Sequence, residues 1–310
     1  MVKSIQKVAI IGTGTIGASW AALFLARGLD VTATDIAPGA EASLRLYIDQ
    51  AWPALERIGL AEGADRARLR FTADLAAAVA GAELVQENGP ERIDFKIALY
   101  EQLDNLLPAE TLIASSSSGL TMSAIQAGCK RHPERCVIGH PFNPPHLIPL
   151  VEIVGGKLTS EDTIARATAF YDGLGKRTVR LHKEMPGHVA NRLAAALFRE
   201  IVYLVSEGVL SVADADTAVC WGPGLRWGVM GPALLYHLGG GAGGIEHFFD
   251  QFTGPLTAMW ASLGQPAITP EVRQLMIDGV LKEAAGRSLD ELAAQRDEAL
   301  LSLMAARARE

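Results

Sequence analysis

A histidine and a glutamate twelve residues apart are the pair in this sequence best suited to acid–base chemistry. His140 follows a short apolar run at 136–139, and Glu152 lies in the next apolar run along the chain. Histidine exchanges a proton near neutral pH, and a carboxylate on its far ring nitrogen fixes the tautomer and stabilises the imidazolium. The pair suits a reaction in which a hydroxyl loses its proton as a hydride leaves the adjacent carbon. The alternative is an exposed loop histidine beside an unrelated edge-strand glutamate.

A glycine-rich turn near the start of the chain is the second chemical signature. The apolar run 7–11 ends at Gly12-Thr-Gly14-Thr-Ile-Gly17, and residues 16–28 have helical character. In such a turn the first glycine permits the bend, the second admits a pyrophosphate and the third lets helix and strand pack closely. The pyrophosphate is expected at the helix N-terminus, so Thr15 and Ile16 join the glycines as predicted cofactor-binding residues. The alternative is a similar turn that binds nothing.

An acidic residue follows the turn at a suitable distance. Asp35 lies eighteen residues beyond Gly17, at the end of a predicted strand over 31–35. Its carboxylate is expected to accept hydrogen bonds from the ribose hydroxyls and to repel a 2′-phosphate. No arginine stands among residues 36–38 to receive such a phosphate, which favours NAD over NADP. The alternative for Asp35 is a strand-end turn residue.

The elements that position these residues are predicted by apolar runs. Further strands are predicted over 82–86, 111–115, 136–139 and 150–154, and a helical excursion over 40–70. Strand, glycine turn, helix and strand form a βαβ crossover. The fold class expected is α/β, a Rossmann-type, doubly wound and mostly parallel sheet, in an NAD-binding domain at 1–185.

The pattern of apolar residues changes after Met185-Pro186-Gly187. A long amphipathic helix is predicted over 188–210, and no strand pattern follows it. We therefore expect an all-α C-terminal domain at 186–310. The glycine cluster at 239–244 is expected to form a tight loop between helices, or a loop that lets backbone approach a ligand.

Composition limits the classes of function. The chain has 310 residues, of which 49% are hydrophobic and 20% charged, and a net charge of −7, which disfavours a nucleic-acid partner. No apolar run approaches the roughly 18 residues of a membrane span, and the N-terminus lacks a signal-peptide pattern, so a cytoplasmic protein is expected. Cys129, Cys136 and Cys220 show neither metal-ligand spacing nor a disulfide pattern, so no metal site is predicted.

Three segments resemble the L-3-hydroxyacyl-CoA dehydrogenase family: Gly139-His140-Pro-Phe-Asn143-Pro, Leu150-Val-Glu152 and Pro186-Gly-His-Val-Ala-Asn191-Arg. With the glycine turn, the resemblance covers nearly the whole chain in the family's order. It implies that His140 is the acid/base, that Glu152 orients it and that Asn191 supports the site. The resemblance also implies that the C-terminal domain serves substrate binding and forms a homodimer.

The same resemblance implies further contacts with NAD. Glu91 and Lys96 match the family's pattern, and Asn143 matches a residue near the nicotinamide. The alternative for Glu91 and Lys96 is a solvated helix start with an ion pair. The family carries a serine directly before a leucine, where this chain has glycine in Ser115-Ser-Ser-Ser118-Gly-Leu120. A neighbouring hydroxyl, Ser117 or Ser118, is the candidate replacement, and simple loop chemistry is the alternative.

A segment of the C-terminal domain indicates the class of substrate. The stretch from Cys220 to Pro232 resembles a branch of the family that contains L-carnitine dehydrogenase and the lambda-crystallin and L-gulonate 3-dehydrogenase proteins, and it is closer to the first. Arg226 is a candidate bidentate clamp for a free carboxylate, and Trp221 and Trp227 are candidates for cation–π contact with a quaternary ammonium. The alternative is that the tryptophans pack in the core between the two domains and that Arg226 pairs with an acid.

These observations predict NAD-dependent interconversion of a small-molecule L-3-hydroxy acid and its 3-oxo acid, most like that of a carnitine 3-dehydrogenase. The rival is a 3-hydroxyacyl-CoA dehydrogenase acting on 3-hydroxybutyryl-CoA. An L-gulonate 3-dehydrogenase and a crystallin-like NAD(H)-binding structural protein are further alternatives. The lysine-centred β-hydroxyacid dehydrogenases are disfavoured, because no matching lysine site is evident.

Overall fold

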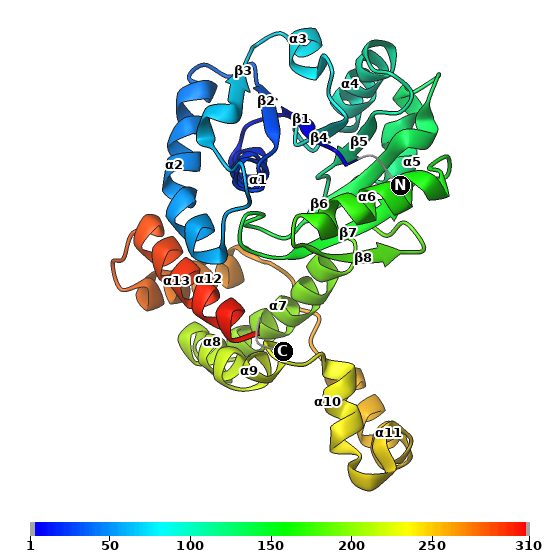
Figure 1. Cartoon of the computed structure of the whole chain (residues 1–310). Coiled ribbons are helices and arrows are strands. Elements are labelled where there is room, and N and C mark those ends of the chain that lie inside the picture. Colours follow the sequence, from blue (N-terminus) through cyan, green and yellow to red (C-terminus); the bar gives the residue numbers. More distant parts are fainter. Residues whose placement is uncertain (1–3, 308–310) are drawn as a thin grey trace. The chain divides into compact units, whose positions relative to one another are not determined.

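The computed structural model describes residues 4–307, and the chain divides into two compact units, Met1–Arg192 and Leu193–Glu310. Within the described residues the first unit holds an eight-stranded sheet with the order β3-β2-β1-β4-β5-β6-β7-β8 (Figure 1). All neighbouring strands are parallel except β6 and β7. The strands are β1 (Lys7–Ile11), β2 (Asp30–Thr34), β3 (Leu69–Phe71), β4 (Leu84–Glu87), β5 (Leu112–Ser115), β6 (Cys136–Pro141), β7 (Leu150–Gly155) and β8 (Arg177–Leu181).

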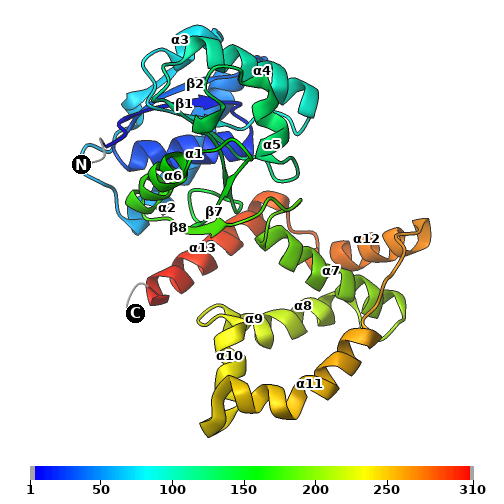
Figure 2. The ribbon, with the colours of Figure 1, turned by 90° about the vertical axis from the view of Figure 1, so that its right-hand side faces the viewer.

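Helices cover both faces of this sheet (Figures 1 and 2). The hydrophobic core on one face includes Trp20 of α1, Leu44 of α2 and Tyr171 of α6, and the core on the other includes Leu99 of α4 and Ile125 of α5. The helices of this unit are α1 (Thr15–Ala26), α2 (Ala40–Ile58), α3 (Leu75–Val79), α4 (Ile93–Leu106), α5 (Met122–Ile125) and α6 (Glu161–Gly173). The prediction of a doubly wound, mostly parallel sheet is confirmed.

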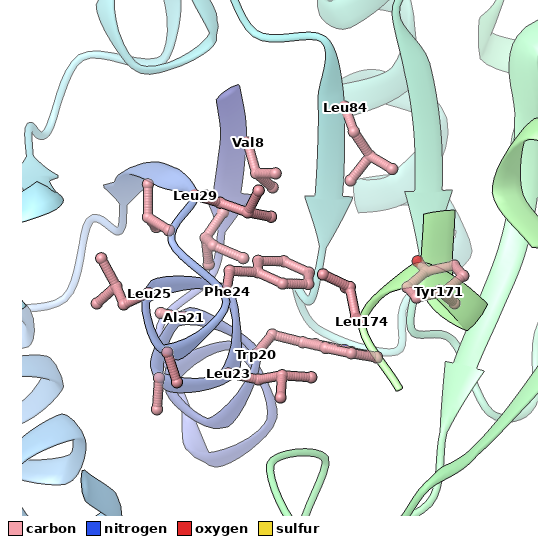
Figure 3. Packing of buried hydrophobic residues seen from close by; sticks show 14 of the residues in the cluster. Val8, Trp20, Ala21, Leu23, Phe24, Leu25, Leu29, Leu84, Tyr171 and Leu174 are labelled. Carbon is pink, nitrogen blue, oxygen red and sulfur yellow. The ribbon is translucent and has the colours of Figure 1, made fainter. Parts of the chain in front are cut away.

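Helix α1 is central to the first core because almost all of its residues are apolar. Its residues from Gly17 to Ala26 are all buried. The Trp20 ring stacks on Phe24 at a centroid distance of 5.3 Å and lies 5.4 Å from the Tyr171 ring. Figure 3 shows these three residues among their neighbours in the core. Each large aromatic side chain buried in this way stabilises the fold by roughly 2–3 kcal/mol. The packing fixes the direction of α1, and with it the position of the glycine turn at its start.

Two strands were missed by the sequence prediction. In the region 40–70 the α-helix ends at Ile58, a short 3₁₀ helix follows at Arg66–Arg68, and the last two residues begin β3, a strand of three residues. At the opposite edge, β8 contains only exposed and partly buried residues and has no continuous apolar run. Both are edge strands that bury little apolar surface, which is why neither carries the apolar signature of a buried strand.

The second unit contains helices and no strand between residues 193 and 307. Helix α7 begins in the first unit, within the predicted helix 188–210. The helices are α7 (Ala190–Ser206), α8 (Val212–Trp221), α9 (Pro223–Trp227), α10 (Pro232–Gly239), α11 (Gly244–Ser262), α12 (Pro270–Ala284) and α13 (Leu289–Arg307). The glycine cluster forms the tight turn between α10 and α11, where Tyr236 and Phe248 lie with ring centroids 4.8 Å apart. Among residues 4–307, no helix is both long and apolar enough to cross a membrane.

Candidate active site

The candidate site of the first unit lies at the carboxyl edge of the sheet. Strands β1, β2, β4, β5 and β6 run in the same direction, so the segments that follow them meet at one edge. These segments carry the glycine turn, Asp35, Glu91, the serine segment 115–118 and the end of β6 with His140. Carboxyl edges of this kind are where open α/β sheets bind ligands.

The glycine turn has the shape that a pyrophosphate requires. Gly12 has a φ of +82°, and a Cβ there would lie 2.8 Å from the carbonyl oxygen of Asn88. A Cβ on Gly17 would lie 1.9 Å from the carbonyl oxygen of Gly12, so only glycine lets α1 approach β1 this closely. A Cβ on Gly14 would meet nothing within 4 Å, which leaves open space beside the backbone.

The start of α1 is electrostatically suited to the same group. Its first turn contains no acidic residue, and its N-cap residue Gly14 offers no side chain to bond the free N–H groups. Thr15 is exposed and Ile16 is partly buried at this end. Unpaired N–H groups and the helix dipole favour a negative charge here. The residues present therefore fit the pyrophosphate of a dinucleotide.

Asp35 stands directly after β2 and is bound to the glycine turn. Its carboxylate accepts hydrogen bonds from the Thr13 N–H at 2.7 Å, the Thr13 hydroxyl at 3.0 Å and the Ala37 N–H at 2.9 Å. Burial raises the pKa of Asp35, but these hydrogen bonds outweigh it and hold the pKa below the ordinary value. The half-buried carboxylate is therefore ionised near neutral pH and has acceptor capacity left for hydroxyl groups.

His140 and Glu152 face each other across the antiparallel pair of β6 and β7. They are direct register partners, and the His140 Nδ1 lies 2.9 Å from a Glu152 carboxylate oxygen. The sequence prediction placed His140 after its strand, whereas the structure extends β6 to Pro141 and includes the histidine. Directly opposed side chains in such a pair are within bonding reach, so the strand pairing itself builds the dyad.

The second carboxylate oxygen of Glu152 holds the start of α7. It accepts hydrogen bonds from the N–H groups of Val189 at 2.8 Å and Ala190 at 3.0 Å. Burial raises the pKa of Glu152, but the bond with His140 and these two N–H bonds hold the pKa below the ordinary value. Because the ionised carboxylate can only accept, His140 Nδ1 must donate, which leaves Nε2 as an acceptor when the ring is neutral.

The serine segment approaches the dyad from β5. The Ser118 hydroxyl lies 2.9 Å from His140 Nε2, and with Nε2 as acceptor this hydroxyl donates. The Ser117 hydroxyl instead donates to Glu91 at 2.6 Å, and Glu91 also accepts from the N–H groups of Gly119 and Leu120. Of the two predicted serines, the structure thus brings Ser118 to the histidine and turns the Ser117 hydroxyl away from it.

Lys96 forms a buried ion pair with Glu87. Its ammonium lies 2.7 and 2.8 Å from the two carboxylate oxygens of Glu87, and it donates to the Gly89 carbonyl at 3.4 Å. The Lys96 and Glu87 side chains are 1% and 0% exposed. Glu87 also accepts from the Ser115 hydroxyl at 2.6 Å, and Lys96 lies 4.0 Å from Glu91. The pair therefore braces the segments after β4 and β5, a role for Glu87 that the sequence analysis missed.

The two predicted asparagines are less constrained. Asn143 is exposed in the loop that follows β6. Asn191 lies in the first turn of α7, next to the backbone groups that Glu152 binds, and it is partly buried. Within residues 4–307 neither side chain makes a hydrogen bond, so both amides are available.

The predicted substrate residues of the second unit lie on α8 and α9. Trp221 ends α8 with 78% of its surface exposed, and Trp227 ends α9 with 40% exposed. Arg226 is exposed and has no ion pair within the described residues.

A second histidine at the site was missed by the sequence analysis. His188 is 3% exposed, and its ring centroid lies 4.8 Å from that of His140. The only available signal was its place in the Pro186-Gly-His-Val-Ala-Asn191 segment, of which only Asn191 was selected.

Comparison with known proteins agrees with this geometry. The family model described as the NAD-binding domain of 3-hydroxyacyl-CoA dehydrogenase matches residues 7–185, and the model for the C-terminal domain of the same family matches residues 187–287. The chain is 47% identical to an L-carnitine dehydrogenase from Streptomyces griseus over 307 residues, which cover 99% of this chain and 91% of that protein.

Two solved structures are similar over most of the chain. A 5-formyl-3-hydroxy-2-methylpyridine 4-carboxylic acid 5-dehydrogenase, described as an NAD⁺-dependent dismutase, has a TM-score of 0.83 and 34% identity, covering 97% of each chain. The 3-hydroxybutyryl-CoA dehydrogenase from Escherichia coli has a TM-score of 0.66 and 30% identity, covering 89% of this chain and 57% of that one. The chain belongs to the 3-hydroxyacyl-CoA dehydrogenase family and is an NAD-dependent oxidoreductase acting on a CH–OH donor.

Proposed function

We propose that the protein oxidises the 3-hydroxyl group of L-carnitine reversibly with NAD. The observation that carries the proposal is the hydrogen-bonded chain from Ser118 through His140 to Glu152, with distances of 2.9 Å at each step. It lies at the sheet edge that also carries the glycine turn and Asp35. A base, a carboxylate that orients it and a nearby hydroxyl are the groups that alcohol oxidation by hydride transfer requires.

The hydrogen bonds indicate the role of each residue in the proposed reaction. With Nδ1–H bonded to Glu152, His140 takes the substrate hydroxyl proton on Nε2, and Glu152 stabilises the imidazolium that results. Ser118 bonds the substrate oxygen beside Nε2 and orients it. NAD supplies the hydride acceptor when it is bound. Asn191, at the start of α7, is proposed to support the site with its free amide.

The proposed cofactor contacts follow the geometry of the sheet edge. Gly12, Gly14 and Gly17, with Thr15 and Ile16, hold the pyrophosphate, and Asp35 holds the ribose hydroxyls. Contacts of Glu91, Lys96 and Asn143 with NAD remain part of the proposal. The hydrogen bonds of Glu91, and those of Glu87 as the partner of Lys96, also support a role for Glu91 and Lys96 in holding the segment 115–120 in place.

A free acid is favoured over a CoA thioester. The names of the S. griseus relative and of the structure at TM-score 0.83 both refer to free acids, while the structure of the thioester enzyme is less similar, at 0.66. Arg226 is proposed to bind the carboxylate of carnitine through its planar pair of N–H donors. Trp221 and Trp227 are proposed to face the trimethylammonium group, each contact contributing about 0.5–2 kcal/mol.

Two further parts of the proposal concern the whole protein. We propose a homodimer, which the family resemblance implies. It is supported by large exposed apolar side chains in the second unit, such as Phe198, Met259 and Trp260. A cytoplasmic location is also proposed, and the three free cysteines suit such a reducing compartment.

The experiment that tests the substrate is a panel of NADH-formation rates. L-carnitine, L-gulonate, L-3-hydroxybutyrate and 3-hydroxybutyryl-CoA are compared at equal concentration, and we expect the highest kcat/KM with L-carnitine. Turnover confined to the thioester contradicts the free-acid assignment. NADH binding without turnover of any compound favours the structural-protein alternative.

A matched pair of variants tests the carboxylate clamp in the same assay. Arg226→Ala is expected to lower kcat/KM for L-carnitine by about 10–100-fold, mainly through KM, since a charge-assisted hydrogen bond contributes roughly 1.5–3 kcal/mol. Arg273→Ala, at an exposed position on α12, is the control and should leave KM unchanged. An unaltered KM in Arg226→Ala rejects the clamp.

A further inference from the structure

His188 lies in an unusual backbone turn directly before α7. Gly187 and His188 have φ values of +76° and +50°, so two successive residues are left-handed. Glycine adopts this conformation freely, whereas for histidine it is uncommon. Such a residue persists where its surroundings hold it, and strained positions of this kind cluster at functional sites.

The surroundings that hold His188 are the three parts of the proposed site. Its Nε2 lies 2.9 Å from the carbonyl oxygen of Ser117, the residue directly before Ser118. Its ring lies against His140 with the planes tilted by 51°. The next two residues, Val189 and Ala190, donate their N–H groups to Glu152. One buried side chain therefore contacts the serine segment and the histidine, and its backbone neighbours bind the glutamate.

The hydrogen bond to Ser117 also fixes the tautomer of His188. A carbonyl oxygen only accepts, so Nε2 carries the hydrogen. Nδ1 is buried and has no partner within the described residues, so a proton there would be left without a hydrogen bond. Burial lowers the pKa of His188 and the nearby His140 lowers it further, against the opposing effects of the Ser117 bond, Glu152 and Glu91. The ring is thus neutral near pH 7.

We propose that His188 is a positioning residue that sets the distance between Ser118 and His140. Its Nε2–H anchors the Ser117 carbonyl while its ring supports the face of His140, so the Ser118 hydroxyl meets Nε2 of His140 at bonding distance. Because the ring is neutral, it adds no second positive charge beside His140 when that residue accepts the substrate proton. This inference rests on the proposed function of the dyad.

The first test reads the ring of His188 directly and needs neither cofactor nor substrate. Nitrogen-15 NMR of the histidine rings is recorded at pH 7, with the His188 signals assigned by their loss in His188→Asn. We expect a neutral ring with hydrogen on Nε2. A charged ring, or hydrogen on Nδ1, overturns the inference whatever the substrate of the protein is.

The second test is kinetic and uses a variant that suits the backbone. Asparagine tolerates the left-handed conformation, so His188→Asn removes the ring without straining the turn. We expect kcat to fall about 10–100-fold, because small misplacements of reacting groups have effects of this size, while the KM for NAD stays unchanged. His182→Asn, at an exposed position in the same unit, is the control.

Coupling to Ser118 separates a positioning role from a general loss of structure. If His188 acts through Ser118, the double variant with Ser118→Ala loses no more than about twofold beyond Ser118→Ala alone. Independent, multiplicative losses overturn the inference, as does a kcat of His188→Asn equal to that of the unaltered protein. The assay uses whichever hydroxy acid of the panel gives turnover, so failure of the carnitine assignment leaves this test intact; where none does, the NMR result decides.

Discussion

At the scale of single residues, the chemistry of the site depends on which ring nitrogens carry hydrogen. Glu152 makes Nδ1 of His140 the donor, and the Ser117 carbonyl makes Nε2 of His188 the donor. The first pair could be predicted because its members lie twelve residues apart on adjacent runs of strand. The second could not, because Ser117 and His188 are 71 residues apart and meet only in the folded sheet.

Another buried residue supports the loop that carries Asn143. The Lys176 ammonium donates to the carbonyl of Pro145 and to that of Ile148 at 3.0 Å, and it lies 5.4 Å from the Trp20 ring centroid. Burial, and to a lesser extent the charge of Arg27, lower the pKa of Lys176 to about 7 from an ordinary value of 10.5. A cation buried in this way costs stability as long as it stays protonated.

The pH dependence of stability tests this description of Lys176. Below pH 7 the lysine is protonated in both folded and unfolded chains, so the full cost of burying it is present. Between pH 7 and 10.5 the unfolded chain holds more protons than the folded one, so stability rises with pH. We expect the unaltered protein to gain roughly 2 kcal/mol relative to Lys176→Met between pH 7 and 9. Urea unfolding at both pH values measures the difference, and a constant difference contradicts the assignment.

At the scale of elements, the strand pairing and the helix starts build the site. The five buried parallel strands that lead to it could be predicted, because strands covered on both faces form continuous apolar runs. The antiparallel direction of β7 could not, since an apolar run such as 150–154 carries no mark of direction. That direction is what sets Glu152 opposite His140. The predicted boundary at 185/186 and the division of the units after Arg192 both fall close to the start of α7.

Two glycine substitutions separate the structural and binding roles of the turn before α1. Gly17→Ala places a Cβ 1.9 Å from a backbone oxygen and should lower the free energy of unfolding by about 1–3 kcal/mol or more. The Cβ added by Gly14→Ala has no heavy atom within 4 Å, so the free energy of unfolding should change by less than about 0.5 kcal/mol. Its methyl group fills the space proposed for the pyrophosphate, so NADH affinity should fall roughly tenfold or more. Thermal unfolding and NADH titration measure the two effects; equal behaviour of the variants contradicts this account.

At the scale of the whole molecule, parallel topology gathers residues from distant parts of the chain at one sheet edge. Asp35, Glu91, Ser118 and His140 follow or end four different strands, and the parallel direction of these strands brings them to the same edge. The substrate is less predictable, because the side chains proposed to bind it, such as Arg226 and Trp221, are exposed, and burial imposes no pattern on them.

Transfer of deuterium from C3 of L-carnitine to the cofactor tests the central claim most directly. The unaltered protein is incubated with NAD and L-carnitine that carries deuterium at the carbon bearing the hydroxyl group, and the reduced cofactor is analysed by mass spectrometry. The account predicts reduced cofactor that contains one deuterium atom from each carnitine oxidised, because the hydride leaves C3 as His140 takes the hydroxyl proton. No reduced cofactor, or reduced cofactor without the label, would contradict it.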